Sequence, residues 1–157
     1  MNMQRSSRVL LVAGILLSTV GFAQEKEKKI KRSDLPAAVE KTVAAQSSGA
    51  KVKGFSEEKE KGQTFYEAEL LVNGHSKDVL MDANGTVVEV EEEVPMSGLP
   101  SEVKAGLQAK TDGGKIVKVE TITKNNKLVA YEAHVNTNGK KSEVQGGPDG
   151  KPLDHEE

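Results

Sequence analysis

The side chains that could do chemistry in this chain are few, and their spacing matches no common catalytic motif. The 157 residues include three histidines, His75, His134 and His155, and no cysteine. The lack of cysteine excludes thiolate nucleophiles, disulfides and thiolate metal sites. The sequence also lacks GxSxG, HExxH and a phosphate-binding glycine loop. It therefore predicts a protein that is not an enzyme and that carries no cofactor.

A metal site on a sheet is a second possibility. The dipeptides Asn73-Gly74 and Asn138-Gly139 are typical of two-residue hairpin turns, in which both residues have positive φ. Such turns fix the register, so that two carboxylates face each other beside the first turn and a histidine faces a glutamate beside the second. Paired carboxylates suit Ca²⁺, and imidazole with carboxylate suits a borderline divalent cation. The alternative is a solvated sheet face with one cross-strand ion pair. We predict no metal site; the residues that would hold an ion are Glu69, Asp78, His134 and Glu143.

The same register divides each hairpin into two faces. One face is apolar and suits packing beneath a helix; Tyr66 and Tyr131 belong to it. The other, which we call the open face, alternates apolar and acidic residues, as many interaction surfaces do. Burial of this face between two halves of the protein would explain the apolar residues equally well. The predicted partner-binding residues are Phe65, Glu67, Glu69, Leu71, Asp78, Leu80, Glu132 and His134.

The elements that position these residues occur twice along the chain. Leu35-Pro36 recurs as Leu99-Pro100, and Tyr66-Glu67-Ala68 recurs as Tyr131-Glu132-Ala133, in the same order. Starting from the leucine of each Leu-Pro, apolar residues at i, i+4 and i+8 predict a helix, and alternating sequence then predicts strands. The predicted fold class is α+β, with two tandem repeats, each an N-terminal helix packed on a three- to four-stranded antiparallel sheet.

The first segment, 1–23, has the pattern of a signal peptide. Arg5 and Arg8 precede an apolar run from Val9 to Val20, and Gly21-Phe22-Ala23 follows as a small-x-small cleavage site. Twelve apolar residues span about 18 Å as a helix, well short of a ~30 Å hydrocarbon core. We therefore expect a periplasmic or secreted protein without stable membrane insertion after cleavage.

The rest of the chain divides by composition. We expect a charged, disordered leader at 24–32, a first repeat at 33–94 and a linker at 95–98. The second repeat, 99–157, has a truncated last strand and an acidic tail. The glutamates Glu89 and Glu91 to Glu93 are interpreted as charges that protect an exposed edge strand; the alternative is that they recognise a basic partner.

The duplicated LPxxV helix start, the YEA strand, the NG hairpin and the later (D/N)G turn resemble the PepSY-like family of secreted bacterial proteins, also described as β-lactamase-inhibitor-like. The resemblance covers about residues 33–94 and 97–153. It implies a helix on an antiparallel sheet, export, and no known catalytic residues. PepSY relatives restrain peptidases, and β-lactamase-inhibitor-like proteins present a sheet surface to an enzyme.

Three functional hypotheses follow. The preferred one is a non-enzymatic binding module of the envelope that inhibits or modulates a peptidase or related hydrolase. The others are a low-affinity metal or small-ligand binding protein of the periplasm, and a structural envelope component. Nucleic acid is not an expected partner, because 22 Lys and Arg are balanced by 24 Asp and Glu.

Overall fold

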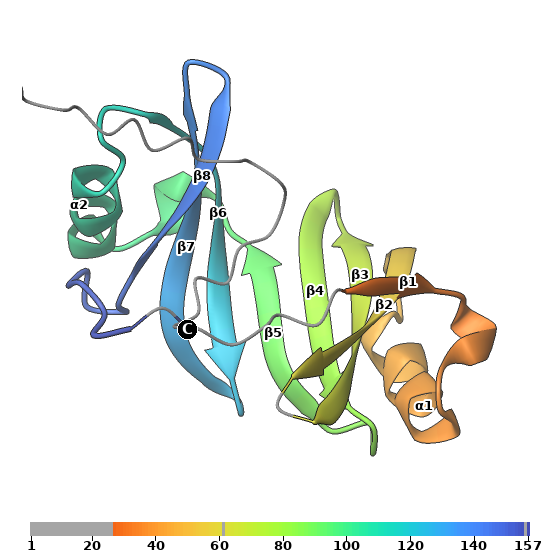
Figure 1. The fold of residues 1–157 in the computed structure, drawn as a ribbon. Helices are drawn as coiled ribbons and strands as arrows, with labels where there is room; N and C mark the ends of the chain where they lie inside the picture. The colour runs from red at the N-terminus through yellow and green to blue at the C-terminus, as the bar shows by residue number, and fades with distance from the viewer. Residues whose placement is uncertain (1–26, 61, 156) are drawn as a thin grey trace, which may run out of the picture.

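The computed structural model describes residues 27–60, 62–155 and 157. The predicted signal peptide lies outside the described residues. Within them, eight strands form one sheet in the order β1 to β8, and each strand pairs antiparallel with the next (Figure 1). The strands are β1 Lys28–Ile30, β2 Lys51–Glu60, β3 Gln63–Val72, β4 His75–Asp82, β5 Val87–Glu93, β6 Lys115–Lys124, β7 Lys127–Thr137 and β8 Lys140–Gly146. The helices are α1 Ala37–Gln46 and α2 Ser101–Ala109, with short 3₁₀ helices η1 Arg32–Asp34 and η2 Met96–Gly98.

The predicted fold class, two tandem helix-plus-sheet repeats, is wrong. The described chain forms a single, mostly β structure with one continuous sheet and two helices. Strand β5 pairs with β6, so that Glu89 lies opposite Lys124 and Glu93 lies opposite Glu120. The glutamates of β5 therefore do not protect an edge. Joining the halves satisfies the backbone groups of two strands that would otherwise be sheet edges.

The hairpin turns set the register as expected. Asn73 and Gly74 have φ of 52° and 91°, and Asn138 and Gly139 have φ of 54° and 87°, as a type I′ turn requires. In the β3–β4 hairpin, Glu69 consequently pairs with Asp78. In the β7–β8 hairpin, His134 pairs with Glu143. The predicted cross-strand neighbours in both hairpins are confirmed.

Both helices pack on the face opposite the open face. Val39 and Val43 of α1 are fully buried against a cluster that includes Ala68 and Val79. Val103 and Leu107 of α2 are buried against a second cluster on β6 and β7. The tyrosines Tyr66 and Tyr131 pack at the margins of these clusters. The predicted helix stripes are confirmed, and each helix covers its own half of the shared sheet.

A turn that contains a glycine packs against the backbone of each helix. Gly85 follows β4 and has φ of +77°, and a Cβ there would collide with the backbone carbonyl of Ala38 in α1. Gly150 follows β8 and has φ of +78°, and its Cβ would collide with the carbonyl of Glu102 in α2. Only glycine combines this backbone conformation with so close an approach.

The first described residues differ from the expectation of a disordered leader. Lys28–Ile30, within the segment expected to be disordered, form strand β1 and pair with β2. At the other end, the backbone N–H of Glu157 donates to Oε1 of Gln145 at 2.8 Å. No helix in the described part of the chain is long and apolar enough to cross a membrane.

Candidate functional site

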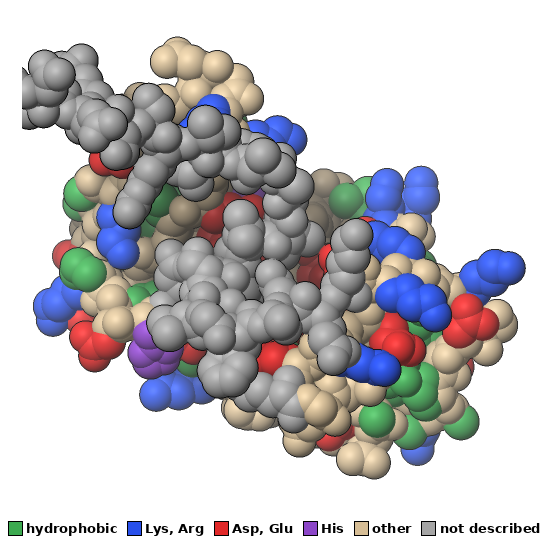
Figure 2. Space-filling model, in the orientation of Figure 1, with side chains coloured by type: hydrophobic (Ala, Val, Ile, Leu, Met, Phe, Trp, Pro, Cys, Tyr) green, Lys and Arg blue, Asp and Glu red, His purple; other side chains and the backbone are tan. Residues whose placement is uncertain are grey.

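The open face carries two rows of carboxylates that cross the middle of the sheet. Asp and Glu side chains are visible over these central strands in Figure 2. In the first row, Asp78 lies directly opposite Glu69 on one side and Glu91 on the other; we call this the β3–β5 acidic row. Glu93, Glu120 and Glu132 form the second, the β5–β7 acidic row. Like charges opposite each other destabilise a sheet, so each row requires compensation.

Among the described residues, only Glu69 at the β3 end of the β3–β5 acidic row forms an ion pair, with Lys29. Asp78 and Glu91 form neither a hydrogen bond nor an ion pair with the other residues that the structure describes. Burial, with smaller contributions from Glu67 and Glu120, raises the pKa of Asp78 to about 7. Burial and the charge of Glu132 raise the pKa of Glu91 to about 9. Both carboxyls therefore hold their protons to an unusually high pH.

The β5–β7 acidic row is compensated at its centre, Glu120, whose side chain is 2 % exposed. Glu120 accepts hydrogen bonds from Ser76 Oγ at 2.9 Å and lies 2.8 Å from Lys118 Nζ. His134 Nε2 lies 2.6 Å from its Oε2. Burial acts to raise the pKa of Glu120, but His134, Lys118 and Ser76 together outweigh burial and lower the pKa to about 2. Because Ser76 belongs to β4, this network also joins the two halves of the sheet.

His134 lies between carboxylates from three strands. Its Nδ1 is 3.3 Å from Glu143 Oε1, and its Nε2 is 3.5 Å from Glu132 Oε1. Gln145 Nε2 donates to Glu132 at 2.9 Å, but burial dominates and raises the pKa of Glu132. Glu120, Glu132 and His134 each offer a ligand atom within 4.8 Å of the others. This set has the chemistry of a divalent-cation site.

The β3 end of the open face contains a lysine of the chain itself. Lys29 in β1 donates to the carboxylate of Glu69 and lies 3.1 Å from Glu27. Beside it, Ser56 Oγ donates to Glu67 at 2.8 Å, yet burial still raises the pKa of Glu67. One ammonium group therefore already lies at the end of the β3–β5 acidic row.

The structure brings together some predicted site residues and separates others. Phe65, Leu71 and Leu80 lie on the open face with Glu67, Glu69 and Asp78, as the register requires, and are partly buried. Glu132 and His134 lie on the same face but on β7, beyond β5 and β6. The four predicted metal ligands consequently form two separate pairs, Glu69 with Asp78 and His134 with Glu143.

The predicted site residues omit Glu91, Glu93 and Glu120, which complete the two rows. A signal was present, because Glu89, Glu91 and Glu93 recur at every second residue and so share a face. Placing them on the open face required the pairing of β5 with β6, and no short turn connects those strands. Helix α2 lies between them in sequence.

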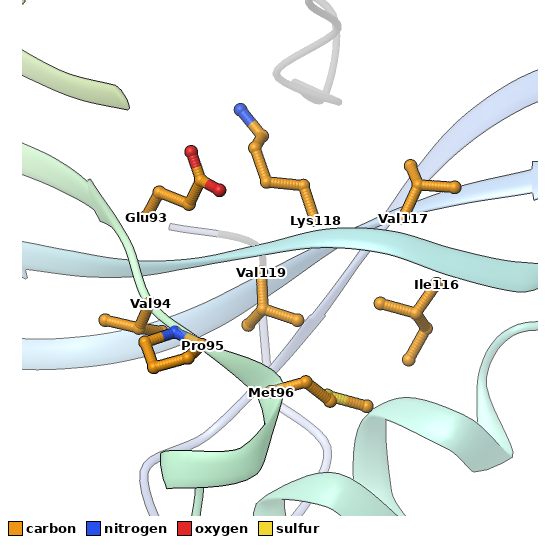
Figure 3. Close-up of a pocket in the computed structure, with 8 residues that line it drawn as sticks. All are labelled: Glu93, Val94, Pro95, Met96, Ile116, Val117, Lys118 and Val119. Atoms are coloured by element: carbon orange, nitrogen blue, oxygen red, sulfur yellow. The ribbon is translucent and has the colours of Figure 1, made fainter. Parts of the chain in front are cut away.

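A small pocket lies where β5, η2 and β6 meet, with a volume of about 170 Å³. Val94, Pro95 and Met96 form its apolar part with Ile116 and Val119. Figure 3 shows Lys118 and Glu93 on one side of β6 and Met96 on the other. Ligand sites usually enclose roughly 300 Å³ or more. The open face is therefore the stronger candidate for binding.

Solved structures with the same fold include three proteins from Bacteroides. A BLIP-like protein from Bacteroides fragilis is 21% identical, with a TM-score of 0.55 over 77% of this chain and 85% of that chain. A DUF2874 family protein from Bacteroides ovatus is 19% identical, with a TM-score of 0.57 over 76% and 84% of the two chains. A candidate periplasmic protein from Bacteroides eggerthii is 16% identical, with a TM-score of 0.59 over 74% and 84%.

At these identities the similarity shows a shared fold. It supports the β-lactamase-inhibitor-like resemblance at that level, whereas a relationship specific to PepSY stays a prediction. The sequence matches no protein-family model and no curated protein.

Proposed function

We propose that this protein is a periplasmic or secreted binding module that uses its open sheet face to bind another protein and catalyses no reaction. One observation carries the proposal. The open face presents Phe65, Leu71 and Leu80 among carboxylates, while both helices pack on the opposite face. Apolar side chains interleaved with polar and charged ones are common in protein interfaces, which taken whole are about as apolar as the rest of a protein surface.

The proposed location is supported by two observations of different kinds. The basic, apolar and small-residue segments of residues 1–23 have the order of a cleavable signal peptide. A structural neighbour with the same fold is named as a candidate periplasmic protein.

The proposed partner is an envelope protein, and a peptidase or related hydrolase is the class that we favour. The name of the BLIP-like neighbour and the resemblance to peptidase-restraining relatives both support this class. Inhibition would require only that the open face cover the partner's active-site entrance, so no catalytic group of this chain is needed.

Capture from periplasmic extract tests the proposal. Immobilised protein should retain a partner that is lost with Phe65→Ser plus Leu71→Ser. Met96→Ser is the control, because it removes a partly exposed apolar side chain away from the predicted face. Circular dichroism verifies folding, and Phe65→Ser alone replaces the double variant if that variant unfolds. Retention of the same partner by a folded Phe65 variant would refute the chosen face.

Metal binding is the second candidate function, and one observation favours it. Ligand atoms of Glu120, Glu132 and His134 lie within 4.8 Å of one another. Calorimetric titration with Ca²⁺, Zn²⁺ and Cu²⁺ should then give heat that His134→Asn reduces. Absence of heat at millimolar metal would remove this candidate.

A further inference from the structure

The β3–β5 acidic row brings together carboxyl groups of which, among the described residues, only Glu69 has an ion-pair partner. Glu69 lies directly opposite Asp78, and Asp78 lies directly opposite Glu91. Oxygen atoms of Asp78, Glu91 and Glu120 all lie within 4.8 Å of one another. Lys118 ion-pairs with Glu120 at 2.8 Å, and within the described part of the chain Asp78 and Glu91 have no ion pair of their own. A cation supplied from outside would stabilise the ionised forms of these two carboxyls, which the fold otherwise disfavours.

Lys29 shows that an ammonium group fits against this row. Its Nζ contacts Glu69, the first member of the row, and also approaches Glu27. The strand that carries it, β1, has only three residues. The same type of contact is open to a partner's lysine or arginine farther along the row.

We infer that the partner of the open face presents a lysine- or arginine-rich segment that crosses the sheet along the β3–β5 acidic row and places a cation between Asp78 and Glu91. This inference rests on the proposed function, because it specifies the chemistry of a protein that binds the open face. Charge complementarity is the argument for it.

The extent of the carboxylates favours a segment over a single ion. Neighbouring strands lie about 4.8 Å apart, so the two steps from Glu69 on β3 to Glu91 on β5 cover about 10 Å. One bound ion contacts only the oxygens within a few ångströms of it. Several cationic side chains along an extended peptide can neutralise the whole width.

Binding of a fluorescent dodecalysine peptide, followed by anisotropy at low ionic strength, tests the inference with protein purified after export. Asp78→Asn plus Glu91→Gln should weaken binding at pH 8 by about tenfold, because the variant can no longer form charge-assisted contacts at the centre of the row. The control, Asp112→Asn plus Glu102→Gln, makes the same chemical changes at exposed positions outside the open face and should change affinity less than about twofold.

The affinity should also rise between pH 6 and pH 8. Asp78 must lose its proton to pair with a cation, and its pKa is about 7. The groups that face it are Glu67 and Glu69 on β3, Glu91 on β5, and Glu120 and Lys118 on β6. Dodecaglutamate should not bind.

The outcomes separate this inference from the proposed function. Equal losses in the two double variants, or no peptide binding, would overturn the inference. Capture of a partner that depends on Phe65 but not on Asp78 and Glu91 would also overturn it and would leave the proposed function standing. Each substitution removes a carboxyl whose ionisation the fold disfavours, so the variant should remain folded, and circular dichroism at the assay temperature verifies this.

Discussion

Replacing Asp78 by asparagine should stabilise the protein at neutral and alkaline pH. The folded protein holds the Asp78 proton until its pKa of about 7, whereas the ordinary value is 3.8. Between these values the folded state binds more protons than the unfolded chain, so the free energy of unfolding falls as pH rises. Asparagine cannot ionise, and it therefore avoids that loss.

The size of the gain follows from the same shift. A change from 3.8 to about 7 corresponds to at most about 4 kcal/mol for a side chain shielded from water. Asp78 is only partly buried, and solvent screening reduces the expected gain to about 1–2 kcal/mol. The advantage of Asp78→Asn should be absent below pH 4, grow from there to pH 7 and then stay constant.

Urea unfolding followed by far-ultraviolet circular dichroism, at intervals from pH 4 to pH 8, measures this advantage. Asp112→Asn is the matched control, because it makes the same change at an exposed turn residue with φ of 50°, where asparagine is well tolerated. Its stability should follow the wild type within about 0.5 kcal/mol at every pH. An Asp78→Asn curve that runs parallel to the wild type, or that lies below it at pH 8, would refute the reasoning.

Three further perturbations test other parts of the structure. Glu120→Gln should lower the free energy of unfolding at pH 7 by about 2 kcal/mol in urea titration, because three donors lose a charged acceptor; a loss below about 0.5 kcal/mol would contradict the network. Gly85→Ala should cost about 3 kcal/mol in thermal unfolding, whereas Gly49→Ala, with similar φ and open space around it, should cost about 1 kcal/mol. Equal costs would mean that α1 does not restrict the turn. Lys29→Ala should change stability by less than about 0.5 kcal/mol yet increase dodecalysine affinity, because it frees Glu69; unchanged affinity would count against the role of that carboxylate.

The hairpins could be predicted from the sequence because the residues that specify each turn are adjacent in the chain. Asn73-Gly74 and Asn138-Gly139 require positive φ, and a two-residue turn leaves one register. That register placed Glu69 opposite Asp78 and His134 opposite Glu143 without any tertiary information. The helix stripes followed in the same way from the spacing of apolar residues.

The single sheet could not be predicted in this way. The pairing of β5 with β6 joins strands that are separated by η2 and α2, and no turn residue specifies it. The error in fold class and the omission of Glu91 and Glu120 therefore have one cause. Each omitted residue lies on one of the two strands that meet at this junction.

The two acidic rows differ in a way that separates structural from binding roles. At the junction of the halves, Ser76, Lys118 and His134 surround Glu120, so its charge contributes to stability. In the β3–β5 acidic row, ionisation of Asp78 or Glu91 raises the free energy of the folded state. A purely structural residue would lose stability and binding together when it is replaced. If the row serves a cationic partner, Asp78→Asn must instead raise stability and lower peptide affinity, and these opposite signs in one variant are the strongest evidence that the two experiments can provide.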